Sequence, residues 1–168
     1  MTDLGNSKRF IEAYGDRCFY VHTSREWYLW NGCYWEKDQD GGIIRLAKKV
    51  AEQITKESIG KSEMFVKHAN RSESLCAIRN MVDLARSELP MQVDRLDKHD
   101  WLLNVQNGVI DLKTGRLLPY DKKYYLSQLA PVKYDAKAAA PQWVAFLNQI
   151  MGGKSELIGL CKKRLAIR

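Results

Sequence analysis

Gly152-Gly153-Lys154-Ser155 comes nearest to a catalytic motif in this sequence, because it has the Gly-Lys-Ser ending of a nucleotide-binding phosphate loop. The loop also requires a glycine five positions before Gly153, and Asn148 stands there. A phosphate loop follows a buried strand, whereas an amphipathic helix is expected here. We therefore predict no nucleotide site, and no other spacing in the chain nominates a nucleophile or a general base.

Metal chemistry is not indicated either. The cysteines and histidines are scattered, without the paired spacing that structural zinc sites use. These residues are Cys18, Cys33, Cys76, Cys161, His22, His68 and His99. Because the sequence also lacks a secretion signal, we expect reduced thiols, no metal and no cofactor in this chain.

The basic residues concentrate in the last third of the chain. The formal net charge is +7, and residues 101–168 carry eleven Lys and Arg against four Asp and Glu. Residues 1–40 carry five against seven. This distribution suits a nucleic-acid partner, and it equally suits a protein that is merely kept soluble by charge. No run of about 18 apolar residues is present, so we expect no membrane span and a cytoplasmic protein.

Aromatic residues could stack on unpaired bases, and three tryptophans gather at positions 27, 30 and 35. The alternative, which we favour, is that Trp27, Trp30 and Trp35 pack a small sheet against helices. The scarcity of basic residues in 1–40 supports packing, since a stacking platform usually lies in a basic groove.

The hydrophobic pattern predicts an α+β fold, mostly helical with small antiparallel β-hairpins and a meander. Thr2 or Asp3 is expected to cap a helix reaching Tyr14, and further helices are expected at 43–58, at 62–88 with a break near 70–72, at 141–150 and from 155. Strands are expected at 18–22, 26–30 and 34–36, with a two-residue turn at Asn31-Gly32. A last strand is expected at 131–134.

Residues 101–125 carry two turn signals, Asn107-Gly108 and Thr114-Gly115, seven residues apart. The Asn-Gly pair predicts a tight turn with positive φ angles. We interpret the stretch as a scaffold of two short hairpin connections. The residues expected to fix it are Asn104, Asn107, Gly108, Asp111 and Gly115.

Three blocks of sequence together resemble one family. The blocks are T-D-L-G-N-S-K-R-F, W-Y-L-W-N-G-C-Y-W-E and W-L-L-N-V-Q-N-G-V-I-D-L-K-T-G-R-L, and they are followed by P-Q-W-V-A-F-L-N-Q-I. They are similar to the N-terminal helicase-associated domain of phage and plasmid primase-helicases, which also occurs in the poxvirus primase-helicase. The similarity covers nearly the whole chain, and L-L-N-V-Q-N-G-V-I-D-L is its most specific part.

The resemblance implies a collar or linker domain between a primase and a superfamily 3 helicase motor that assembles as a hexameric ring around DNA. Residues 1–150 would be this domain, made of 1–40, 43–88 and 101–134, and 151–168 would begin the connection to the motor. ATP and Mg²⁺ would belong to the motor. We expect this chain to be a fragment or a truncated prophage gene, without ATPase or helicase activity of its own.

Two hypotheses of function follow. The first is a non-catalytic module of a replicative helicase in a bacterial host, with DNA, the rest of the primase-helicase and neighbouring ring subunits as partners. Its candidate phosphate contacts, chosen from charge and placement, are Lys8, Arg9, Arg71, Arg79, Lys113 and Arg116. One basic ridge could also be formed by Arg71, Arg79 and Arg86, although a solvated face with local ion pairs is the interpretation that we favour.

The second hypothesis is a stand-alone phage regulator that binds DNA or a host protein through the aromatic hairpin.

Overall fold

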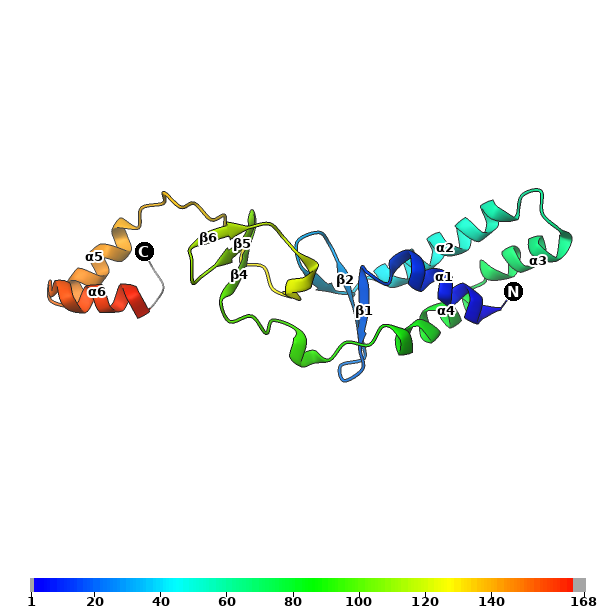
Figure 1. The fold of residues 1–168 in the computed structure, drawn as a ribbon, viewed down its shortest axis with the longest axis horizontal. Coiled ribbons are helices and arrows are strands. Elements are labelled where there is room, and N and C mark those ends of the chain that lie inside the picture. The colour runs from blue at the N-terminus through cyan, green and yellow to red at the C-terminus, as the bar shows by residue number, and fades with distance from the viewer. Residues whose placement is uncertain (1, 165–168) are drawn as a thin grey trace. The chain divides into compact units, whose positions relative to one another are not determined.

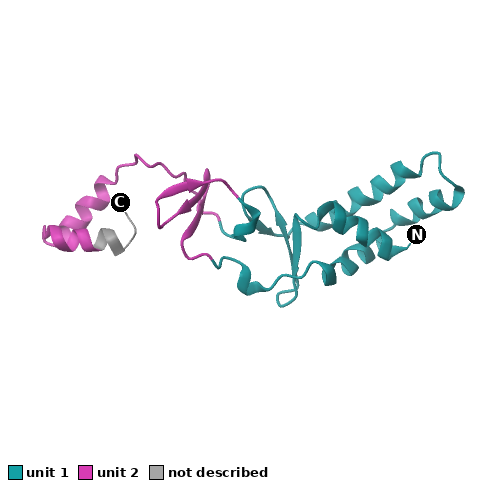
Figure 2. Ribbon diagram, in the orientation of Figure 1, with its two compact units in different colours: residues 1–98, 121–128 teal, residues 99–120, 129–168 magenta. Residues whose placement is uncertain are grey.

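The computed structural model describes residues 2–164, with side chains described through residue 160, and confirms the α+β class (Figure 1). The chain divides into two compact units (Figure 2). Residues 1–98 and 121–128 form unit 1, and residues 99–120 and 129–168 form unit 2.

Four helices of unit 1 lie side by side (Figure 1). They are α1 (Asp3–Tyr14), α2 (Gly42–Ser58), α3 (Glu63–Ser72) and α4 (Leu75–Glu88). Thr2 caps α1, since its hydroxyl oxygen accepts a hydrogen bond from the amide of Gly5 at 3.2 Å. The Asp38 carboxylate receives the amides of Gly42 and Ile43 at 2.6 and 2.9 Å, which satisfies the first free donors of α2. The break predicted near 70–72 in the helix at 62–88 falls just after Ser72, slightly later than expected.

The apolar faces of these helices meet in one core. Phe10, Ala47, Met81 and Ala85 are completely buried there, beside Ile54 and Val82. Burying a side chain of the size of Phe or Met contributes about 1.5–3 kcal/mol, so this core is the main source of stability for unit 1.

The three-stranded antiparallel meander predicted in unit 1 is present, in the order β1-β2-β3. Its strands are β1 (Cys18–Val21), β2 (Glu26–Trp30) and β3 (Trp35–Lys37). Trp27 and Trp35 are only 6% and 4% exposed, so they pack rather than form a stacking platform. The predicted two-residue turn was wrong: Trp30 pairs with Trp35 across a four-residue loop, in which the Asn31 side chain accepts hydrogen bonds from the amides of Cys33 and Tyr34.

Residues 121–128 return to unit 1 and complete this meander. The backbone amide of Trp35 donates to the carbonyl oxygen of Leu126 at 2.8 Å, and the Trp35 indole donates to the carbonyl oxygen of Lys122, also at 2.8 Å. Leu126 is buried, and the Tyr125 ring stacks on Trp35. This segment contains a short 3₁₀ helix, η2 (Lys122–Tyr124), and another, η1 (Val93–Arg95), lies between α4 and residue 98.

Unit 2 contains a second antiparallel sheet of three strands in the order β4-β5-β6. The strands are β4 (Leu102–Val105), β5 (Gly108–Asp111) and β6 (Arg116–Leu118), and the helices that follow are α5 (Pro141–Ile150) and α6 (Ser155–Arg164). Val105 pairs with Gly108, so the first turn consists of Gln106 and Asn107 and lies one residue earlier than predicted. Asn107 does not have the positive φ that we expected, whereas Gly108 has a φ of +148°.

Gly108 lies where two strands approach too closely for a side chain. A Cβ atom at this position would be 2.5 Å from the carbonyl oxygen of Leu118 and 2.9 Å from a methyl carbon of Leu117. Its φ of +148° is also unfavourable for any L-residue with a side chain. Both constraints require glycine here.

The strand predicted at 131–134 is absent: backbone pairing is limited to a bridge between Ala130 and Val105 and a hydrogen bond from the Gln106 amide to the Val132 carbonyl oxygen, and a side chain holds the end of the segment. The Asn107 amide receives the backbone N–H of Tyr134 at 2.9 Å and donates to the carbonyl oxygen of the same residue at 2.9 Å. The Tyr134 hydroxyl in turn donates to the carbonyl oxygen of Gly115 at 2.8 Å. Tyr134 thereby ties this segment to both turns of the sheet.

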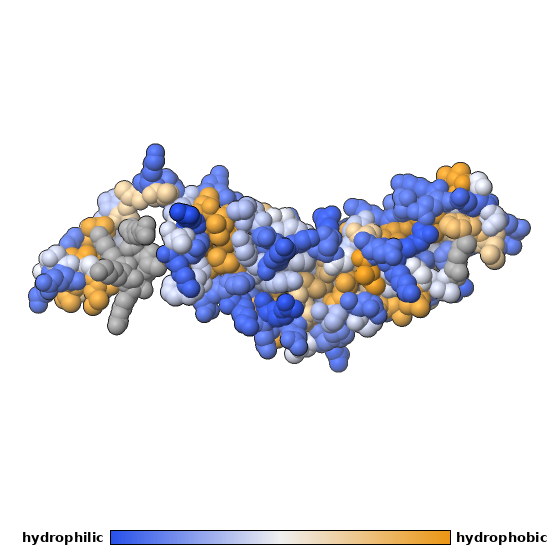
Figure 3. Space-filling model, in the orientation of Figure 1, coloured by the Kyte–Doolittle hydropathy of each residue, from blue (hydrophilic) through white to orange (hydrophobic). Residues whose placement is uncertain are grey.

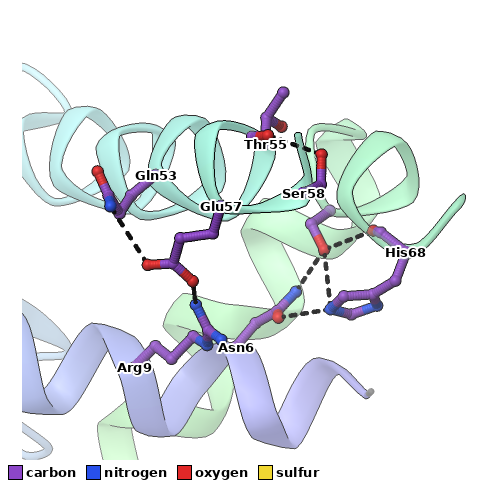
Figure 4. Close-up of polar contacts among 8 residues, drawn as sticks. Asn6, Arg9, Gln53, Thr55, Glu57, Ser58 and His68 are labelled. Atoms are coloured by element: carbon purple, nitrogen blue, oxygen red, sulfur yellow. Dashed lines mark hydrogen bonds and ion pairs between the residues drawn. The ribbon is translucent and has the colours of Figure 1, made fainter. Parts of the chain in front are cut away.

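A buried polar network joins α1 to α3 (Figure 4). The Asn6 amide donates to the Ser72 hydroxyl at 2.9 Å, and its carbonyl oxygen lies 3.1 Å from His68 Nε2. Asn6 and Ser72 are 2% and 1% exposed. Burial, together with the positive charges of Arg9 and Arg71, lowers the pKa of His68 from its ordinary value of 6.5. Burial and these charges therefore favour neutral His68.

Replacing Gly108 by alanine is expected to destabilise the fold, because the new methyl group meets the Leu118 carbonyl. We expect the free energy of unfolding, measured by urea denaturation with circular dichroism, to fall by about 3 kcal/mol. Gly115→Ala is the matched control, since Gly115 has a φ of +69° with open space around it, and it should cost only about 1–2 kcal/mol. Equal losses in the two variants would contradict the close-approach argument.

His68 should make stability depend on pH. Because its pKa is lowered in the folded state, the unfolded chain binds the proton more readily, and stability present above about pH 6.5 is lost as the pH falls below that value. His68→Gln should therefore lose less free energy of unfolding between about pH 7 and pH 5 than the parent chain. His22→Gln, outside the network, is the control and should behave like the parent. An unchanged difference in His68→Gln would refute the role of His68.

Candidate nucleic-acid interface

The turn between β5 and β6 holds two of the predicted phosphate contacts, Lys113 and Arg116. One oxygen of the Asp111 carboxylate accepts a hydrogen bond from the amide of Lys113 at 2.9 Å, and the other accepts from the Thr114 hydroxyl at 2.8 Å. The Gly115 amide closes the turn on the Asp111 carbonyl oxygen at 2.7 Å. The sequence Asp-Leu-Lys-Thr-Gly-Arg thus fixes the backbone from which both cations project.

The hydrogen bonds from Thr114 and from the Lys113 amide lower the pKa of the Asp111 carboxyl. Asp111 is therefore an anion that is bound to the turn. Among the described side chains, no ion pair within 4 Å involves Lys113 or Arg116, and both are exposed. Two cations against one carboxylate leave this turn with a positive excess that an external anion can meet.

Trp101 lies beside this turn and was not among the sequence-predicted site residues. Its carbonyl oxygen accepts a hydrogen bond from the Leu112 amide at 2.8 Å, which brings it next to the strand end before Lys113. The Lys113 ammonium nitrogen lies 5.3 Å from the centroid of the Trp101 ring, and Trp101 is 50% exposed. The alternation of residues 101, 103 and 105 could have indicated that Trp101 extends one face of β4.

The other four predicted contacts lie on the helices of unit 1. Lys8 and Arg9 are on α1, Arg71 is on α3 and Arg79 is on α4, and all four are exposed. Arg9 is engaged already: its guanidinium contacts the Glu57 carboxylate at 2.5 Å, and this ion pair competes with any phosphate (Figure 4). The six predicted residues therefore fall into two groups, one in each unit.

The possible basic ridge of Arg71, Arg79 and Arg86 does not follow one helix. Arg71 belongs to α3, whereas Arg79 and Arg86 belong to α4. Arg86 is paired with Asp83 at 2.9 Å, and its guanidinium carbon lies 5.1 Å from the centroid of the Tyr20 ring. The interpretation as a face with local ion pairs therefore holds for Arg86.

A groove of about 870 Å³ runs along α1 and α2. Its walls carry charges of both signs, among them Arg9, Lys49, Glu52 and Glu57.

Within residues 2–160, no three His, Cys, Asp or Glu side chains lie close enough to hold a metal ion. None of the described helices is long and apolar enough to cross a membrane. Gly152, Gly153 and Lys154 follow helix α5 and not a strand.

Similarity to known proteins points to one family. A family model described as "D5 N terminal like" matches residues 7–152. A curated protein, the glutamate–tRNA ligase of Chlorobium phaeobacteroides (strain BS1), is 27% identical over 129 residues, which are 71% of this chain and 24% of the ligase. The chain thus spans about a quarter of that protein, and the ligase activity is a property of that protein.

The family match includes α1 from residue 7 onward, α2 to α4, both sheets and α5, and it ends before α6. The resemblance found in the sequence blocks is thereby confirmed. This chain belongs to the D5 N-terminal-like family, the N-terminal domain of phage and plasmid primase-helicases.

Proposed function

We propose that this chain is a non-catalytic collar or linker domain of a replicative DNA primase-helicase, which supports ring assembly and engages DNA. The observation that carries the proposal is the family match over residues 7–152. A domain of this kind works through surfaces, so its DNA contacts and subunit contacts are the features to test.

The β5–β6 turn supports the DNA-binding part. Lys113 and Arg116 are exposed and make no ion pair with any described acidic side chain, whereas Arg9 is partly neutralised by Glu57. Cations that hold no close ion pair lose none when they bind a phosphate, and they release the counterions of DNA. Lys8, Arg71 and Arg79 are also exposed and have no ion pair within 4 Å among the described side chains, but they are spread over three helices, whereas Lys113 and Arg116 project from one turn. We therefore place the main DNA contact on unit 2 and regard Lys8, Arg71 and Arg79 as secondary contacts.

Exposed apolar side chains of unit 1 support the assembly part. Ile59, the first residue of the α2–α3 connection, and Met64, in the first turn of α3, are 80% and 72% exposed. A contiguous exposed apolar patch marks an interaction site, so we place the assembly surface at this connection. Light scattering over a concentration series tests this part: a molar mass that rises with concentration supports assembly, and a constant monomer mass removes it for the isolated chain.

The stand-alone regulator was expected to use the aromatic meander. Trp27 and Trp35 are buried in that meander, so most of its aromatic surface serves the fold. The coding sequence downstream discriminates between the two hypotheses. An in-frame or frameshifted G-x-x-x-x-G-K-[ST] within a few tens of codons supports the helicase module, and an unrelated gene with its own start favours the regulator.

DNA binding should depend on the β5–β6 turn. We expect the double variant Lys113→Ala/Arg116→Ala to bind fluorescent DNA more weakly in anisotropy titrations, and to reduce the slope of log affinity against log salt by about 0.7–0.9 per lost phosphate contact. Lys48→Ala/Lys61→Ala removes the same charge from exposed positions of unit 1 and should change neither quantity by as much. No binding by the parent chain at about 50 mM salt would eliminate DNA engagement and leave assembly as the proposed role.

A further inference from the structure

Trp101 is a large aromatic side chain that the fold does not need for its core. It is 50% exposed, in contrast to Trp27 and Trp35, which are 6% and 4% exposed. Trp101 immediately precedes β4 (Leu102–Val105), and its hydrogen bond with the Leu112 amide continues the pairing of Leu102 with Asp111 by one residue. Trp101 therefore lies on the same face of the sheet as Leu103, two positions later. The hydrogen bond from the Leu112 amide to its carbonyl oxygen holds it at the end of that sheet.

The same face of the sheet continues as an apolar row. Leu103 pairs with Ile110, and Ile110 pairs with Leu117, so these three side chains lie across the strands on one face. Ile110 is buried, but Leu103 and Leu117 are 41% and 40% exposed. Figure 3 shows hydrophobic residues exposed over this sheet. An aromatic ring with apolar neighbours is therefore open to a flat, apolar ligand surface.

Charge distinguishes this face from a plain apolar patch. The Lys113 ammonium lies 5.3 Å from the centroid of the Trp101 ring, and Arg116 follows at the start of β6. The one carboxylate in the turn, Asp111, is bound to Thr114 and to the backbone. A ligand that suits this arrangement has a flat aromatic surface directly beside a negative charge.

We propose that Trp101 is a stacking platform for an unpaired base of single-stranded DNA, and that Lys113 and Arg116 bind the flanking phosphates. The proposal rests on the DNA engagement proposed above and specifies its substrate as the unpaired strand. In a duplex each base is covered by its neighbours, so an indole can reach a base face only where the strand is single. Stacking on an aromatic side chain tolerates any base, which gives binding without sequence preference.

The test compares three nucleic acids with the full chain in anisotropy titrations: a thymidine oligonucleotide of about 15 nucleotides, an abasic strand of the same length and charge, and a duplex. We expect the parent chain to bind the thymidine strand more tightly than the other two. Trp101→Ala should weaken binding of the thymidine strand by about 5-fold or more and leave the abasic strand and the duplex unchanged. Its salt slope should stay that of the parent, whereas the slope of Lys113→Ala/Arg116→Ala falls.

Two further variants complete the design. Trp101→Phe keeps an aromatic ring and should recover most of the affinity for the thymidine strand. Phe146→Ala removes another exposed aromatic ring of unit 2, 48% exposed, and should bind like the parent. If Trp101→Ala does not fold, two measurements still test the stacking proposal: the parent chain's preference for the thymidine strand over the abasic strand, and the affinity of Trp101→Phe for the thymidine strand.

Equal affinity of the parent chain for the thymidine and abasic strands would overturn the stacking proposal while DNA engagement stands. So would a Trp101→Ala variant that binds all three nucleic acids like the parent, or one that changes only the molar mass in light scattering, since the face would then meet a protein. Absence of binding to every nucleic acid would instead refute DNA engagement itself, and the stacking proposal with it.

Discussion

The sheet of unit 2 depends on one close approach of its backbone. Gly108 passes so near to the Leu118 carbonyl oxygen that no Cβ fits between them, and this fixes how β5 and β6 lie against each other. From that register follow the pairing of Asp111 with Arg116 and the hydrogen-bonded turn between them. The position of Trp101 follows in turn from the pairing of β4 with β5. Gly108, which has no side chain, thus helps to determine where Arg116 and Trp101 lie, and these two residues belong to the proposed DNA-binding site.

The two units use their aromatic residues in opposite ways. In unit 1 the meander places Phe19, Trp35 and Tyr125 in one cluster, and Trp35 also forms the hydrogen bonds that hold residues 121–128. Aromatic rings there replace the large core that a three-stranded sheet cannot build by itself. In unit 2 the sheet is held by turns and by the hydrogen bonds of Asn107 and Tyr134, and the Trp101 ring beside the Lys113 ammonium stays 50% exposed.

Local signals predicted the helices, both sheets and the α+β class, because capping by Thr2, the apolar stripe of α2 and the alternation in 101–112 act over a few residues. They failed where a distant residue intervenes. The Asn107 side chain bonds the backbone of Tyr134, which no turn rule anticipates, and the segment at 131–134 is not a strand. For the candidate site, charge alone nominated Lys113 and Arg116, but it also nominated Arg9, whose partner Glu57 is 48 residues away. Trp101 was overlooked because its exposure is set by packing and not by local sequence.

Residues 99–120 are inserted into unit 1, which is resumed and completed by 121–128. A ribosome that synthesises the chain from its N-terminus cannot supply Leu126 for Trp35 until the whole hairpin has emerged, so the meander remains unfinished during that interval. A protease that cut the β5–β6 turn would leave two pieces held together by the partners of Trp35. The three-stranded sheet of residues 99–120 is thus an insertion between residues 98 and 121 of unit 1. Sequence changes in its β5–β6 turn would leave the contacts within unit 1 in place.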